Sequence, residues 1–261
     1  YRRFTREWNS YTYLGKKVEG SFEKYLEEDK NSEINKPGVR EKLVVKNIQN
    51  GSEYLILPGR KHENYEYPDL LVSAKRAHNG ENWNQAHESL KQENSLMLTI
   101  RQYFDFLNLL KSGRAYDGNG RQVNKPRLDE ILDDIVTVRA PWRAEWLDAK
   151  FSSQGIVRKQ FYISYHNIDN GRLIETTEEL HQDTLKKDKT PGVDLDYLIN
   201  VDATYQGLPP KNIPQGKLYY WHPRNNAVAR FRADSGRADL SCSRSPDYSD
   251  SSLGVRAAKI R

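Results

Sequence analysis

The chain of 261 residues has a single cysteine, Cys242, which excludes a disulfide within the chain. It also lacks an apolar run long enough for a membrane span or a signal sequence. The net charge of +5 comes from 41 basic and 36 acidic residues that are mixed along the chain, without the basic stripe typical of nucleic-acid binding. With 36% hydrophobic residues, the composition indicates a globular protein with a sizeable core and no nucleic-acid partner.

The common catalytic and metal motifs are missing as well. We find no G-x-S-x-G elbow, no P-loop and no paired-carboxylate motif. No two histidines have the H-E-x-x-H spacing of a zinc helix; the six are His62, His78, His87, His166, His181 and His222. We therefore expect no catalytic residue, no cofactor and no bound metal.

Two acidic segments leave calcium open as an alternative. Asp194, Asp196 and Asp202 lack the glycine and the closing glutamate of an EF-hand loop, so loop capping is the favoured role. The run from Asp117 to Gly120 is explained equally well as a glycine-rich turn.

Apolar residues at helical spacing predict three helices, at 82–93, 99–111 and 126–138. Thr99 is a plausible N-cap of the second helix, and Gly113 follows its end. Strands are expected at 42–48 and 53–57, joined at Asn50-Gly51, and at 144–151, 156–165 and 172–175. Helices followed by irregular short antiparallel strands predict an α+β fold.

The segment from 238 to 243 alternates with a period of two. Ala238, Leu240 and Cys242 are expected to point inward, with Cys242 a small buried hydrophobe, while polar residues fill the places between them. Between His222 and Ala258 there is no Lys, Glu, Gln, Met or Trp, although Lys, Glu and Gln are frequent elsewhere. Folding alone does not require this bias.

The runs WHPRNNAVARF, RADLSCSRSP and SSLGVRAAK resemble the variable region of the target proteins of diversity-generating retroelements, especially the archaeal ones. In that family a reverse transcriptase misincorporates opposite template adenines, so AAY codons become NNY codons, which never encode the five missing residue types. The resemblance implies a C-type lectin fold of the formylglycine-generating-enzyme subtype with a terminal signature, here Gly254, Val255 and Arg256. We expect Arg256 to anchor a buried ion pair.

The resemblance also implies a division into an accessory segment, 1–60, and a lectin-like domain, 61–261, with 219–259 as the variable region. The fixed scaffold is expected to be Trp221, Pro223, Phe231, Leu240, Cys242, Leu253, Gly254 and Val255. The exposed, ligand-binding positions are expected to be Tyr220, His222, Arg224, Asn225, Asn226, Arg232, Gly236, Asp239, Ser241, Ser243, Ser245, Asp247, Tyr248 and Asp250. Their composition is similar to that of an antibody paratope.

The implied function is variable recognition of a ligand, a protein or another cell-surface molecule, by a protein that is itself on a cell surface, secreted or on a virion. An archaeal or archaeal-virus source is implied. The alternatives are a non-catalytic structural or assembly protein with a lectin-like fold, and an enzyme related to formylglycine-generating enzymes. The enzyme is disfavoured because that chemistry needs a pair of cysteines, and the chain has one.

Overall fold

The computed structural model describes residues 10–13, 16–19, 50–63, 65–155, 160–200 and 203–261. Contacts within the chain divide it into two units, Tyr1–Glu41 and Lys42–Arg261. In the first unit β1 (Ser10–Tyr13) pairs antiparallel with β2 (Lys16–Glu19). The division falls earlier than the expected limit at residue 60, because β3 (Tyr54–Leu57) is part of a sheet of the second unit.

The three expected helices are present, and side-chain caps fix where they begin. They are α2 (Trp83–Gln92), α3 (Ile100–Lys111) and α4 (Lys125–Val136). The side chains of Asn82 and Thr99 each accept a hydrogen bond from the N3 backbone N–H, and the side chains of Gln85 and Gln102 accept one from the backbone N–H of the cap residue. A short helix, α5 (Leu195–Ile199), follows later in the chain.

The fold is mixed α+β, but the expected order of helices before strands is wrong. Among the described residues of the second unit, four strands precede α2, namely β3 and then β4 (Arg60–His62), β5 (Tyr65–Tyr67) and β6 (Leu70–Ser73). Short hairpins escape a search for long periodic segments because each contributes only three or four residues. The expected strand at 42–48 lies outside the described residues, and Asn50 takes the left-handed conformation that opens a short 3-10 turn, Gly51–Glu53.

An eight-stranded sheet with the order β12-β11-β10-β15-β16-β14-β13 forms one side of the second unit, with β17 paired to β10. Its strands are β10 (Arg143–Gln154), β11 (Gln160–Asp169), β12 (Arg172–Glu179), β13 (Lys189–Val193), β14 (Leu218–Trp221), β15 (Ala227–Ala233), β16 (Ala238–Arg244) and β17 (Leu253–Val255). The expected hairpin between β11 and β12 is confirmed, with Asn170 and Gly171 both at positive φ in its turn. Residues 156–159 of the expected strand 156–165 are outside the described residues.

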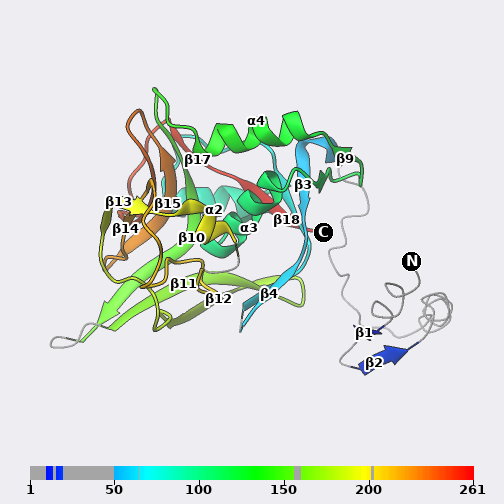
Figure 1. The fold of residues 1–261 in the computed structure, drawn as a ribbon, viewed down its shortest axis with the longest axis horizontal. Coiled ribbons are helices and arrows are strands. Elements are labelled where there is room, and N and C mark those ends of the chain that lie inside the picture. Colours follow the sequence, from blue (N-terminus) through cyan, green and yellow to red (C-terminus); the bar gives the residue numbers. More distant parts are fainter. Residues whose placement is uncertain (1–9, 14–15, 20–49, 64, 156–159, 201–202) are drawn as a thin grey trace. The chain divides into compact units, whose positions relative to one another are not determined.

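A four-stranded sheet with the order β3-β6-β18-β7 forms the other side. It contains β7 (Leu96–Met97) and the last strand, β18 (Ala257–Ile260), which pairs with both β6 and β7. Helix α3 contacts both β3 and β10, so it fills the core between the two sheets (Figure 1). A further small hairpin joins β8 (Ala115–Tyr116) and β9 (Gln122–Val123).

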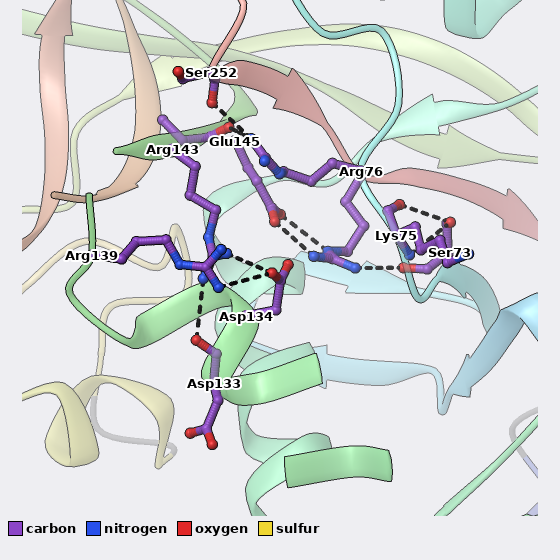
Figure 2. A network of polar contacts seen from close by, with 11 residues as sticks. Ser73, Lys75, Arg76, Asp133, Asp134, Arg139, Arg143, Glu145 and Ser252 are labelled. Carbon is purple, nitrogen blue, oxygen red and sulfur yellow. Dashed lines mark hydrogen bonds and ion pairs between the residues drawn. The ribbon is translucent and has the colours of Figure 1, made fainter. Parts of the chain in front are cut away.

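Buried ion pairs connect these layers. Arg256 is 1% exposed and its Nη2 lies 2.7 Å from Oε1 of Glu145, which confirms the expected ion-pair anchor. At the start of β10, the Nη1 of Arg143 donates to Asp134 of α4 at 2.5 Å (Figure 2). Arg76 donates to the backbone oxygen of Ser252 at 2.7 Å, next to this network. Among the described helices, none is at once long and apolar enough to cross a bilayer.

Candidate functional site

The two faces of β14, β15 and β16 differ in character. One face packs Leu240 and Cys242 into the core, both 0% exposed. The other, here called the C-terminal face, consists of residues that alternate with the core residues, namely Tyr219, Trp221, Arg230, Arg232, Asp239, Ser241 and Ser243. In the strand register Asp239 lies opposite Tyr219 and Arg232, and Ser241 lies opposite Trp221 and Arg230. The expected assignment of Leu240 and Cys242 to the inside and of the residues between them to the opposite face is confirmed.

Arginines and aromatic rings are layered on this face. The guanidinium of Arg230 lies 5.6 Å from the ring centres of both Trp142 and Tyr248. Arg244 lies 4.6 Å from the ring of Tyr248. Each cation therefore lies over an electron-rich ring face, which is an attractive arrangement. Trp142 and Tyr248 are both half-buried, so the cluster is covered but still reaches the surface.

Arg232 and Asp239 provide the ionic part of the face. Arg232 Nη2 lies 2.5 Å from Asp239 Oδ2 and 3.1 Å from Asp234 Oδ2. Burial raises the pKa of Asp239 by more than Arg232 and the neighbouring arginines lower it, so the net pKa lies above its usual value. Arg237 also lies near Asp239, at 3.9 Å, and over the ring of Tyr219 at 5.0 Å.

Several buried polar atoms of this cluster have no hydrogen-bond partner among the described residues. They are Nε and Nη1 of Arg230, Nε of Arg237, Oδ1 of Asp239 and Nε of Arg244. Burial and the nearby Arg244 lower the pKa of Arg230 to about 10, so the guanidinium remains charged at neutral pH. Buried donors of this kind are normally satisfied, and leaving one unpaired costs about 1–3 kcal/mol. The face therefore holds more hydrogen-bonding capacity than the fold itself uses.

Three expected surface positions, Tyr220, Asp239 and Ser241, are buried, and Tyr220 lies on the wrong face of its strand. Tyr220 is 0% exposed, lies on the core face of β14 and donates its hydroxyl proton to Leu185 O at 3.2 Å. Its neighbours Tyr219 and Trp221 are the half-buried residues of that strand, so Trp221, expected in the fixed scaffold, lies on the C-terminal face. The other expected scaffold residues are buried; they are Pro223, Phe231, Leu240, Cys242, Leu253, Gly254 and Val255.

Asp239 and Ser241 were expected to be exposed but are only 1% and 4% exposed. Both point away from the core, and the side chains around them cover them. Ser241 Oγ lies 3.3 Å from Ser243 Oγ, and Asp239 is covered by Arg232. The two residues are therefore the floor of the C-terminal face, not its outer surface.

His222 and Arg224 form a separate group at the end of β14. Asp188 makes a polar contact with each of them: its Oδ1 lies 2.7 Å from His222 Nδ1, and its Oδ2 lies 2.8 Å from Arg224 Nη2. Burial raises the pKa of Asp188, but the hydrogen bonds from His222 and the charge of Arg224 lower it more, so the net pKa lies below its usual value. These two expected positions are half-buried and tied to a residue outside the expected variable region.

The remaining expected positions lie in turns at the surface. Asn225, Asn226, Gly236, Ser245 and Asp247 are exposed, whereas Asp250 is half-buried. Asn226 has a φ of 56°, a left-handed conformation that restricts which residues fit there.

Several of these turn positions make hydrogen bonds: Asn225 Oδ1 accepts from Ser153 N at 2.8 Å, and Asp247 N donates to Ser245 Oγ at 3.3 Å. Asp250 accepts a hydrogen bond from Ser252 N, and Gly236 N donates to Asp234.

Sequence reasoning missed Arg230, Arg237, Arg244, Tyr219 and Trp142. A signal for the first was present, since Arg230 and Arg232 are two residues apart and a strand places such residues on one face. Trp142 comes from the start of the β10 region, far from the others in sequence, and no local pattern links it to them.

The other expected features have structural explanations. Asp194 caps α5, accepting from Tyr197 N at 3.1 Å, and Asp196 pairs with Lys111, while Asp202 is outside the described residues. Asp117 Oδ1 accepts from the backbone of Asn119 and Arg121 in a tight turn. Cys242 is fully buried, and burial raises the pKa of its thiol, which disfavours the reactive thiolate.

No family model matches the chain, and searches among curated proteins and solved structures also return no match.

Proposed function

We propose that this is a ligand-binding protein whose C-terminal face is diversified by a retroelement on a fixed scaffold, a C-type lectin fold of the formylglycine-generating-enzyme subtype. The observation that carries the proposal is the set of unpartnered guanidinium nitrogens beside aromatic rings on that face. Tyr, Trp and Arg dominate the energetic centres of binding sites, and buried donors left free by the fold are available to a ligand.

The residue types on the face support the same proposal. Arg, Tyr, Ser, Asp and Asn can all be encoded by NNY codons, whereas Trp221 and Trp142 cannot arise this way and lie outside the stretch that lacks the five excluded types. In this proposal the tryptophans are fixed walls, and the diversified side chains lie between them.

The charge of the face favours an acidic ligand for this variant. Four arginines, Arg230, Arg232, Arg237 and Arg244, face two carboxylates, Asp234 and Asp239. A carboxylate or phosphate group would accept hydrogen bonds from the free nitrogens and relieve the repulsion between Arg230 and Arg244.

The test is to sequence the DNA on both sides of the gene. The proposal requires a near-copy of the segment encoding 219–259 beside a reverse-transcriptase gene, with differences confined to adenines of that copy. The differing codons should fall on surface positions such as Asn225 and Asp247 and spare Tyr220. A flanking region without a near-copy or a polymerase gene would remove the diversified function, although the anion-binding face would still call for a fixed partner.

A further inference from the structure

Away from the C-terminal face, three potential metal ligands meet at the other end of the large sheet. His87 lies on α2, Asp148 on β10 and His166 on β11, and one ligand atom of each lies within 4.8 Å of the other two. These residues are distant in sequence, so no spacing motif could reveal them. The two His–Asp separations are 3.4 Å for His87 Nε2 and 3.1 Å for His166 Nδ1.

A bulge in β10 brings the carboxylate to this position. The register between β10 and β15 shifts between Leu147 and Lys150, so Asp148 lies in the irregular part of the strand. Bulges re-aim side chains and are over-represented next to functional sites. Asp148 Oδ2 accepts the backbone N–H of His166 at 2.8 Å, which fixes the carboxylate against β11.

His87 is held in place by packing and not by a hydrogen bond. Its ring meets that of Trp83 edge-on, with centroids 4.1 Å apart, and Trp83 is itself anchored by a hydrogen bond from its Nε1 to Leu147 O at 2.9 Å. His87 Nε2 is buried and has no hydrogen-bond partner among the described residues. A buried imidazole nitrogen that makes no well-formed hydrogen bond and lies 3.4 Å from a carboxylate oxygen is available as a metal ligand.

The separations suit a small divalent cation. With metal–ligand bonds of about 2.0–2.1 Å, two ligands of a tetrahedral zinc ion lie about 3.3 Å apart. Both His–Asp separations are close to this value, and the ligand atoms of the two histidines lie within 4.8 Å of each other. Two histidines and one carboxylate form a common ligand set for divalent transition metals.

The cluster opens onto a cleft of about 660 Å³ whose lining includes Trp83, Leu96, Lys150 and Glu175. Asp148 itself is only 2% exposed. A cation bound here would have protein ligands on one side and open coordination positions toward the cleft.

We propose that His87, Asp148 and His166 form a binding site for a divalent transition-metal ion of the zinc type, with open coordination positions facing the cleft. The site is separate from the C-terminal face and does not depend on the proposed ligand-binding function. Neither histidine is needed to complete the core, since both are half-buried.

The test is calorimetric titration of the chelator-treated full chain with zinc chloride. The unmodified protein should bind one zinc ion, and His87→Gln and His166→Gln should each weaken binding by at least about tenfold. Cobalt(II) provides a second readout, because its visible absorption bands report the coordination number and should be altered by the same two substitutions.

His62→Gln is the matched control. His62 Nε2 lies 2.8 Å from a buried carboxylate, Asp105, but Arg60 and Arg101 surround that pair and no second imidazole joins it. Zinc affinity should be unchanged in this variant. If the unmodified protein binds zinc no more tightly than His87→Gln does, or if His62→Gln weakens binding equally, the metal site is refuted and the cluster is a His–Asp–His ion pair only. Melting curves of the three variants exclude unfolding as the cause.

Discussion

The guanidinium of Arg256 is held by the carboxylate of Glu145 through two hydrogen bonds, Nη2 to Oε1 at 2.7 Å and Nε to Oε2 at 3.1 Å. The side chains are 1% and 3% exposed, and Nη1 of Arg256 also donates to Ser73 O at 2.9 Å. Arg256 lies between β17 and β18, Glu145 lies on β10, and Ser73 ends β6. The pair therefore joins the large sheet to the four-stranded sheet.

Breaking this pair should destabilise the fold strongly. Arg256→Met leaves the carboxylate of Glu145 buried without a cation, and such losses reduce the free energy of unfolding by about 3–5 kcal/mol. The double variant Arg256→Met with Glu145→Leu removes both charges and should recover most of the loss. Urea denaturation of the three proteins measures this, and equal losses in the single and double variants would show that the charges themselves matter little.

Gly254 should tolerate no side chain. A Cβ at this position would lie 2.5 Å from Asn79 Oδ1 and 2.7 Å from Ala77 O, which accepts the N–H of Val255. We expect Gly254→Ala to reduce the free energy of unfolding by about 1–3 kcal/mol, because the backbone has to move. Gly236→Ala is the control, since the nearest atom there is 3.6 Å away. Thermal melting that shows equal stability for both variants would contradict the close approach at Gly254.

Substitutions at exposed and at buried positions of the C-terminal segment should differ in their effect on the free energy of unfolding. Asp247→Ser is on the exposed surface and should change the free energy of unfolding by only about 0.5 kcal/mol. Asn225→Ser is also exposed but removes the hydrogen bond from Ser153 N to Asn225 Oδ1, so it should cost about 0.5–1.5 kcal/mol. Tyr220→Ser removes a fully buried ring and should cost about 3–5 kcal/mol. Chemical denaturation compares the variants. If Tyr220→Ser were as stable as the unmodified protein, the assignment of Tyr220 to the core would be wrong.

Local chemistry explains which elements were predictable from the sequence. Thr99 and Gln102, three residues apart, form a capping box, so the local sequence predicts where α3 begins. The turn Asn170-Gly171 likewise specifies its hairpin. In the run Leu218 to Trp221, by contrast, every side chain is large and at least partly apolar, so the pattern does not show which residues point inward. Tyr220 was placed on the wrong face for this reason.

Features that depend on distant contacts could not be predicted. Asp148 faces His87 and His166 because a bulge and strand pairing bring together three separate elements. The alternation at Leu240 and Cys242 predicted which face of β16 is polar, but not that Trp142 and Tyr248 would close over its arginines. Periodicity gives the direction of a side chain within its own strand, whereas the neighbours of that side chain come from the topology.

Asp105 should make the protein sensitive to acid. It accepts a hydrogen bond from Tyr67 at 2.6 Å and lies 2.8 Å from His62 Nε2 and 3.2 Å from Arg101 Nη2. Burial raises its pKa, but these partners lower it more, so the net pKa lies below that of an unfolded aspartate, about 3.9. A carboxyl with a lowered pKa stabilises the fold above the unfolded value, and this stabilisation is lost as the pH falls through the folded value.

Asp105→Asn should therefore lower the melting temperature at pH 7 and lower it less at pH 3, which is below the unfolded value, so that the unfolded aspartate is protonated and part of the stabilisation is gone. Melting curves at the two values for both proteins give the comparison. A difference in melting temperature that does not change between them would mean that the charge of Asp105 contributes nothing to stability.

Replacing Arg230 should not destabilise the fold, in contrast to replacing Arg256. Both are buried, but no carboxylate of the described residues pairs with Arg230, and two of its nitrogens have no hydrogen-bond partner there. Burial together with Arg244 lowers its pKa to about 10. Arg230→Met removes a poorly compensated charge and loses only the contacts with the rings of Trp142 and Tyr248. We expect a change in the free energy of unfolding between no loss and a gain of about 1 kcal/mol, measured by urea denaturation. Binding residues are often retained at the expense of stability, and a loss comparable to that of Arg256→Met would instead make Arg230 part of the structural core.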